Sequence, residues 1–137
     1  MYTKINEKDS AMKLGAIYSK EKTTFTLFSP VADSVFVIFY DKGNDSAEKG
    51  RLEMMRGEGE LRSIFSATAE GNLDGVYYTY EVHTSDGTFS SHDPYARACG
   101  VNGHRSMVID LSKTDPDGFA DEDRPKLADP MSMIITE

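Results

Sequence analysis

Residues 93–111 read Asp-Pro-Tyr-Ala-Arg-Ala-Cys-Gly-Val-Asn-Gly-His-Arg-Ser-Met-Val-Ile-Asp-Leu. Asp93-Pro94 marks the end of a strand, because proline fixes its own φ angle and moves the preceding residue out of the α region. Asn102-Gly103 favours a turn with positive φ angles, and residues 107–111 form a short apolar strand. By themselves these residues predict a strand, a loop, a turn and a second strand.

The rest of the chain shows the same alternation of strands and turns. Apolar residues recur with period two, and no long stretch has helical periodicity. Asp86-Gly87, between two strand-like runs, is the clearest hairpin signal. Many short strands predict an all-β fold, an antiparallel β-sandwich of two packed sheets. The predicted strands are residues 16–19, 24–29, 35–40, 51–56, 61–68, 76–84, 88–92 and 106–111.

Composition excludes several classes of function. The chain has 137 residues, enough for one domain with its own core. Its 23 acidic residues outnumber 15 Lys and Arg, and the net charge of −8 argues against binding to nucleic acid or to an anionic membrane. The single cysteine excludes an internal disulfide framework. Residues 1–13 are polar and carry no signal-peptide core, so we expect a cytoplasmic location.

The most specific pattern in the chain is the order in which six short segments follow one another. They are residues 14–19 (Leu-Gly-Ala-Ile-Tyr-Ser), 24–30 (Thr-Phe-Thr-Leu-Phe-Ser-Pro), 74–82 (Asp-Gly-Val-Tyr-Tyr-Thr-Tyr-Glu-Val), 93–111, 124–127 (Arg-Pro-Lys-Leu) and 131–137 (Met-Ser-Met-Ile-Ile-Thr-Glu). In this order they resemble the carbohydrate-binding module family 48 domain that precedes the catalytic barrel of type I pullulanases, in glycoside hydrolase family 13. The resemblance implies an immunoglobulin-like sandwich and a parent enzyme that hydrolyses α-1,6-glucosidic linkages.

The resemblance also implies a division of the chain. Residues 1–11 would be an N-terminal tail, residues 12–112 the accessory sandwich, and residues 113–137 an extended C-terminal linker and the start of the catalytic barrel. Residues 113–130 contain three prolines and many charged residues, which favours an extended linker with a short turn around Asp121. The barrel would carry the catalytic carboxylates, so we expect this chain alone to be no enzyme.

The residues themselves offer little catalytic chemistry. Ser91-His92-Asp93 has the letters of a triad, but adjacent strand residues point to opposite faces and cannot form the relay. Cys99 is a lone cysteine in a loop, where a small buried hydrophobic role is the ordinary interpretation. We therefore predict no catalytic residue.

Metal and cofactor sites are also not predicted. His83, His92 and His104 share no ligand spacing, and no CxxC pair accompanies them. The acidic residues of 115–123 lack the ordered pattern of a calcium loop, so a solvated linker is the favoured interpretation.

Carbohydrate binding is the best remaining activity of the chain itself. Glycogen-binding relatives have a tryptophan just before a His-Asp-Pro segment, and the resemblance places Phe89 there as a candidate for carbohydrate binding. A phenyl ring offers less stacking area than an indole and no N–H donor. Tyr80 stands where those relatives carry a lysine, and Phe28 replaces a further tryptophan, where we expect a core residue. The candidate ligand is an α-glucan such as glycogen, pullulan or dextrin.

Contact with the catalytic barrel is the other expected role. Asp93, Pro94, Tyr95 and Arg97 are candidates for the domain junction. The alternative is that they only close the sandwich edge, with Tyr95 packed in the core. Residues 35–40 are apolar on both faces, so their outer face needs cover from the barrel or from within the domain. A third hypothesis is association with itself or a partner through residues 35–40 or 131–135.

Overall fold

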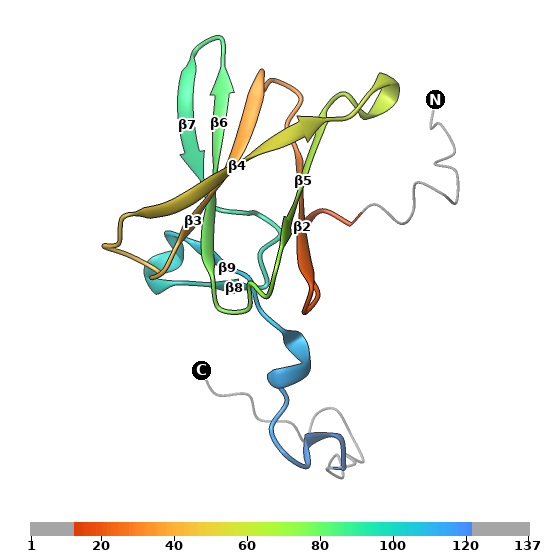
Figure 1. Cartoon of the computed structure of the whole chain (residues 1–137), viewed down its shortest axis with the longest axis vertical. Coiled ribbons are helices and arrows are strands. Elements are labelled where there is room, and N and C mark those ends of the chain that lie inside the picture. Colours follow the sequence, from red (N-terminus) through yellow and green to blue (C-terminus); the bar gives the residue numbers. More distant parts are fainter. Residues whose placement is uncertain (1–12, 122–137) are drawn as a thin grey trace, which may run out of the picture.

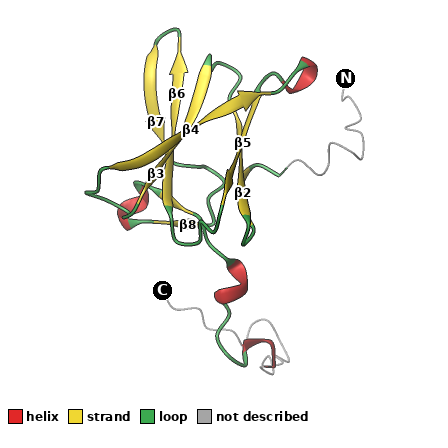
Figure 2. Cartoon of the chain, viewed as in Figure 1, coloured by secondary structure: helices red, strands yellow, loops and turns green. Residues whose placement is uncertain are grey.

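The computed structural model describes residues 13–121, which form β-strands and single 3₁₀ turns without an α-helix in that range (Figures 1 and 2). The strands are β1 (Gly15–Tyr18), β2 (Lys22–Phe28), β3 (Ser34–Tyr40), β4 (Glu48–Arg56), β5 (Ile64–Glu70), β6 (Tyr77–Thr84), β7 (Gly87–Ser91), β8 (Ala98–Cys99) and β9 (Ser106–Met107). The 3₁₀ turns are η2 (Gly59–Leu61), η3 (Val101–Gly103), η4 (Leu111–Lys113) and η5 (Phe119–Asp121).

The strands form one antiparallel sheet that folds over into two layers. Their order is β1-β2-β5-β4-β3-β6-β9-β8, and β7 pairs with the other half of β6. Strand β4 crosses between the layers, because its residues as far as Met54 pair with β3 while Met55 and Arg56 pair with β5 (Figure 1). We call β1, β2, β5 and the end of β4 layer A, and the remaining strands layer B. The predicted antiparallel sandwich is confirmed.

The core lies between the layers and follows the period-two pattern of the strands. Phe25 of β2 packs edge-on against Tyr78 of β6, with ring centroids 5.0 Å apart. Burial of apolar surface supplies the main stabilisation of such a core. The buried hydrophobic cluster consists of Phe25, Leu27, Ala32, Val35, Val37, Met54, Phe65, Tyr78, Tyr80 and Val108.

Residues 35–40 find their cover within the domain. Val35 and Val37 belong to the core, and Ile38, on the opposite face, is only 3% exposed. Nearby, the Arg105 guanidinium lies 3.6 Å from the ring centroid of Tyr40 and ties the loop after β3 to the segment before β9. The association hypothesis needs an exposed apolar patch on residues 35–40, and the burial of these residues contradicts that version of it.

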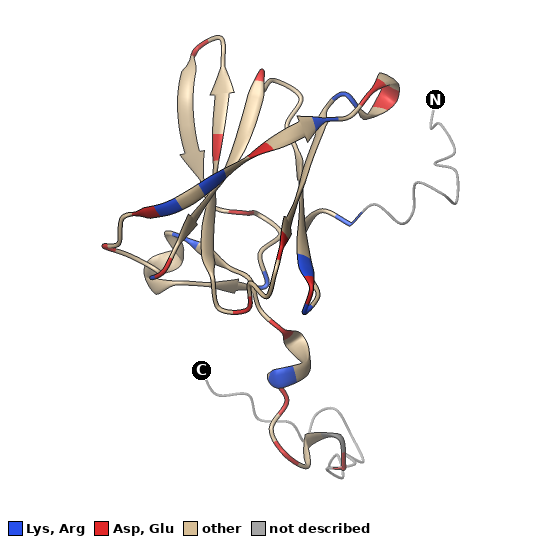
Figure 3. Cartoon of the chain, in the orientation of Figure 1, with Lys and Arg blue, Asp and Glu red and all other residues tan. Residues whose placement is uncertain are grey.

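The outer faces of the two layers differ in charge. Figure 3 shows acidic and basic residues along β4 and on β6, whereas β2 and β5 are mostly uncharged. On layer B, Arg51 forms ion pairs with Glu48 and Glu81. On layer A, the Thr24 and Thr68 hydroxyls share a hydrogen bond of 3.2 Å.

Most turn predictions are confirmed. The residues Thr84 and Gly87 pair across the β6–β7 hairpin, and Asn102 and Gly103 have φ angles of 55° and 67°. The short turn around Asp121 is η5. Residues 1–11 and 131–135 lie outside the described part, so the predicted tail and barrel strand remain predictions.

Three strand boundaries are wrong by three residues or more, and one of them is the start of β4, which is Glu48 instead of residue 51. Strand β9 ends at Met107, and the chain turns into η4 because the Asp110 carboxylate accepts the Ser112 N–H at 3.1 Å and caps the turn. Leu61 ends η2, so β5 begins later than predicted, at Ile64. Strand β8 was not predicted, because its two residues are too few to show an alternation of apolar and polar side chains.

Candidate functional site

Asp93 lies at the edge of the sandwich with its carboxylate turned inward. The residue is 2% exposed. Its Oδ2 accepts hydrogen bonds from the hydroxyls of Tyr78 at 2.7 Å and Tyr80 at 3.2 Å. Its Oδ1 accepts the Tyr95 N–H at 2.8 Å, and its own N–H donates to Ser106 Oγ at 2.8 Å. This network closes the sandwich between the layers.

The network holds both tyrosines in their neutral form. Burial, and secondly the negative charge of Asp93, raise the pKa of Tyr78 far above its usual range. The same two causes raise the pKa of Tyr80. Neutral hydroxyls can donate to a carboxylate, which satisfies a buried charge that would otherwise be costly. The arrangement is structural, because the burial of the carboxylate leaves no room for a ligand on it.

The neighbours of Asp93 are exposed. Tyr95 is 52% exposed, so the alternative that its ring packs in the core is wrong. Its Cβ lies against β1, where a β-carbon on Gly15 would come within 3.0 Å. Pro94 and Arg97 are also exposed, and Arg97 lines a depression of 280 Å³ beside β1. The junction role of Asp93, Pro94, Tyr95 and Arg97 stays a prediction.

Phe89 is an exposed aromatic residue on the edge strand β7. It pairs with Val82, which packs against the core, so the ring lies on the inner side of layer B, at its open edge. It is 55% exposed. A polar groove of 490 Å³ is lined by the residues that follow Phe89 in the chain and by the β8–β9 connection: Ser90, Ser91, His92, Asn102, Gly103 and His104. An exposed ring offers a stacking surface, and the polar side chains of the groove offer partners for hydroxyl groups.

Two other aromatic residues, Tyr80 and Phe28, stand where the resemblance places residues of the glycogen-binding relatives or of the pullulanase module. Tyr80 is buried and bonded to Asp93, so it cannot replace a lysine that contacts sugar. The expectation that Phe28 is a core residue is wrong. The register of β2 puts Phe25 and Leu27 inside and Phe28 on the outer face, where it is 53% exposed.

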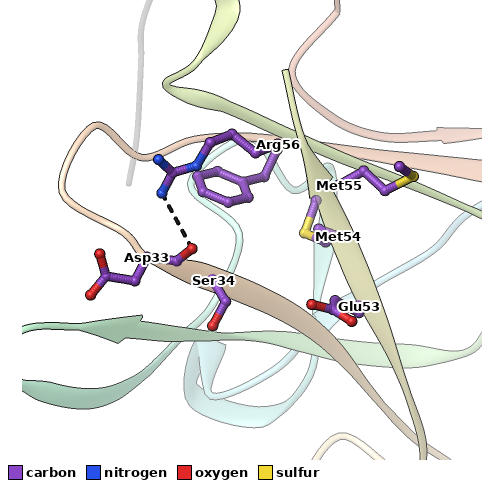
Figure 4. Close-up of a pocket in the computed structure, with 7 residues that line it drawn as sticks. Asp33, Ser34, Glu53, Met54, Met55 and Arg56 are labelled. Atoms are coloured by element: carbon purple, nitrogen blue, oxygen red, sulfur yellow. Dashed lines mark hydrogen bonds between the residues drawn. The ribbon is translucent and has the colours of Figure 1, made fainter. Parts of the chain in front are cut away.

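A second depression, of 490 Å³, lies where β4 crosses between the layers (Figure 4). The Arg56 guanidinium sits 5.1 Å from the ring centroid of Phe65 and donates to the carbonyl oxygens of Ala32 and, at 3.2 Å, Asp33. These bonds tie the loop before β3 to β4. No sequence signal pointed to this arrangement, since the partners are backbone carbonyls.

The residues considered for catalysis do not form a catalytic arrangement. Ser91 Oγ donates to the carbonyl of its neighbour His92, and the Asp93 carboxylate is engaged by tyrosines. Cys99 is exposed, so its interpretation as a buried hydrophobe is wrong. Within residues 13–121 no three His, Cys, Asp or Glu side chains are grouped to hold a metal ion. No helix in that range is long and apolar enough to cross a membrane.

Two packed antiparallel layers, with an edge closed at Asp93, define an immunoglobulin-like β-sandwich module. The chain belongs to the family of carbohydrate-binding module 48 (isoamylase N-terminal domain), whose model matches residues 13–96.

Similar proteins and structures are much longer than this chain. The pullulanase from Paenibacillus barengoltzii, in complex with maltohexaose and alpha-cyclodextrin, is 33% identical with a TM-score of 0.78, over 89% of this chain and 18% of that one. The pullulanase from Bacillus acidopullulyticus is 34% identical with a TM-score of 0.75, over 86% of this chain and 14% of that one. Pullulanase A of Streptococcus pneumoniae serotype 4 is 31% identical over 116 residues, which are 80% of this chain and 9% of that protein.

Proposed function

We propose that this chain is the non-catalytic accessory module of a pullulanase-like glycosidase whose parent polypeptide hydrolyses α-1,6-glucosidic linkages in α-glucans. The observation that carries the proposal is the likeness to the Paenibacillus pullulanase, which covers 89% of this chain but 18% of that enzyme. The buried Asp93 network supports a structural role, because it rigidifies the edge of the sandwich. The module would mainly support the catalytic barrel, and exposed Tyr95 and Arg97 are candidates for contact with it.

A reducing-sugar assay on pullulan tests this proposal. We expect the polypeptide encoded by the complete reading frame to release reducing ends, and the 137-residue chain to release none. Hydrolysis by the chain alone, or none by the complete polypeptide, would overturn the proposal.

Binding of α-glucan by the chain itself is a second candidate function. It is favoured by the exposed ring of Phe89 on β7, the strand whose next residues, Ser90 and Ser91, line a polar groove. Affinity electrophoresis in gels containing glycogen or pullulan tests it, with Phe89→Ala as the variant and Phe28→Ala, on the other layer, as the matched control. We expect retardation that only Phe89→Ala removes. Equal mobility of all three proteins in the presence and absence of glucan would contradict it.

A further inference from the structure

Strand β7 forms an open edge of layer B. It pairs with β6 on one side and with no other strand of residues 13–121 on the other (Figure 1). Its five residues, Gly87–Ser91, carry no charge, contain no proline and are all exposed. A strand edge of this kind presents unpaired backbone N–H and C=O groups, which can pair with a further strand.

The hydrogen-bond pattern of β6 identifies which groups of β7 point outward. The His83 carbonyl accepts the Asp33 N–H at 2.7 Å, so the polar backbone groups of His83 face the β3 side. Thr88 is the partner of His83 on β7, and this pair therefore makes no mutual hydrogen bonds in the antiparallel ladder. The backbone N–H and C=O of Thr88 point away from β6, and those of Ser90, two residues further on, do the same.

The other strand edges are protected in ways that β7 is not. The edge of β1 lies against the segment 93–97, since a β-carbon on Gly15 would come within 3.0 Å of Tyr95. Strand β8 has only two residues. Strand β4, at the opposite edge of layer B, carries four charged residues before it crosses between the layers: Glu48, Lys49, Arg51 and Glu53. Charge, shortness and cover by a loop all hinder edge-to-edge pairing, and β7 has none of these protections.

A second copy of β7 is a suitable partner, because the strand is self-complementary. Two antiparallel copies centred on Phe89 place Thr88 of each copy opposite Ser90 of the other, and these pairs exchange their outward hydrogen bonds. The two Phe89 rings then meet on the same side of the joined sheet, where an aromatic cross-strand pair is stabilising. The ring is 55% exposed in the single chain and is therefore free to make this contact.

The two ends of this pairing bring complementary side chains together. Continued beyond the strand, the same register places Asp86 of one copy opposite His92 of the other. Both residues are exposed, and His92 lines the polar groove together with His104. Histidine N–H groups can donate to the Asp86 carboxylate, and the groove leaves room for the β6–β7 turn that carries it. An unrelated extended peptide would pair with the same edge without supplying this contact.

We propose that two copies of this chain associate through antiparallel pairing of β7 with β7, a site distinct from residues 35–40 and 131–135. The net charge of −8 on each copy opposes association, but at about 0.15 M salt charges more than about 8 Å apart are largely screened. A single short strand pair buries little area, so the dimer is weak, with a dissociation constant on the order of 0.1 mM. The inference does not depend on the proposed function.

Hydrogen exchange of the 137-residue chain tests this pairing without any substitution. We expect the amides of Thr88 and Ser90 to exchange about fourfold more slowly at about 1 mM protein than at about 10 µM, which is the ratio of the monomer fractions. The Phe89 amide, which faces β6, should change little between the two concentrations. Exchange at Thr88 and Ser90 that is independent of concentration would overturn the inference.

Sedimentation equilibrium with two substitutions at one position separates backbone pairing from a side-chain contact. Ser90→Pro removes the outward N–H, and proline is tolerated on an edge strand where the N–H faces solvent. Ser90→Ala, the matched control, removes the hydroxyl and keeps the N–H. We expect Ser90→Ala to dimerise like the unmodified chain and Ser90→Pro to dimerise at least about tenfold more weakly. A monomeric unmodified chain at about 1 mM, or equal dimerisation of Ser90→Pro, would overturn the inference and leave the proposed function intact.

Discussion

Phe89 and Asp93 lie on one short stretch of chain, yet the structure gives them opposite environments. The Phe89 ring is exposed on the edge strand β7, whereas the Asp93 carboxylate is buried under two tyrosine hydroxyls. The chain leaves β7 between them and crosses the open side of the sandwich toward β1, so Phe89 remains outside and Asp93 enters the boundary of the core. The comparison shows that accessibility here depends on the position of the chain relative to the sheet edge, and not on residue type.

Removing the buried carboxylate is expected to have the largest effect. Asp93→Ala leaves the hydroxyls of Tyr78 and Tyr80 and the Tyr95 N–H without their acceptor and opens a cavity. We expect a loss of about 3 kcal/mol in the free energy of unfolding, measured by urea denaturation. Asp93→Asn, which retains one acceptor oxygen, should lose less. A loss below about 1 kcal/mol for Asp93→Ala would show that the network contributes little.

Alkaline pH should weaken the same network. Because the pKa values of Tyr78 and Tyr80 are raised above the ordinary 10.0, the folded state holds these protons more tightly than the unfolded state does. Their contribution to stability is therefore complete below about pH 10 and is lost as the pH rises further. Urea midpoints should fall from about pH 10 to about pH 12, and less steeply for Tyr78→Phe, which costs about 1–2 kcal/mol at neutral pH. Parallel pH curves for the two proteins would contradict this account.

Thr23 offers a contrast within the core, because its buried hydroxyl has no hydrogen-bond partner among the described residues. Valine has nearly the same shape and no polar atom to desolvate. Thr23→Val is expected to stabilise the domain by about 1 kcal/mol in urea denaturation. Thr24→Val, at the next position on the outer face, is the contrasting variant: its hydroxyl shares a hydrogen bond with that of Thr68, so this substitution should not stabilise the domain. Destabilisation by Thr23→Val would reveal a partner for that hydroxyl.

Truncating the exposed ring should have the smallest effect on folding. Phe89 is more than half exposed, so Phe89→Ala is expected to change the free energy of unfolding by less than about 0.5 kcal/mol. A loss of glucan retardation by this variant can then be assigned to the ring itself. A loss of about 2 kcal/mol or more would instead place Phe89 in the core and withdraw it as a binding candidate.

The contrast also explains which features the sequence could predict. The central strands were predictable, because alternation places residues such as Phe25 and Val35 inside and repeats over several positions. The partners of Asp93 were not, since Tyr78 and Tyr80 lie 15 and 13 residues away and meet it only through the sandwich closure. Tyr95 lies in the same segment, which crosses from β7 toward β1. Such a loop has no periodic pattern from which the exposure of Tyr95 could be predicted.

Phe28 and the outer face of layer A were missed for a different reason. An aromatic residue at the end of an apolar strand is ordinarily assigned to the core, and only the register with β5 shows that Phe28 shares the face of Thr24 and Ser66.

The most direct test of the accessory role is the stability of the complete enzyme with and without residues 13–121. The account predicts that the truncated enzyme has a temperature of half-inactivation on pullulan lower by roughly 5 °C or more, because the module covers and supports the glycosidase part. An unchanged inactivation temperature in the truncated enzyme would contradict that role.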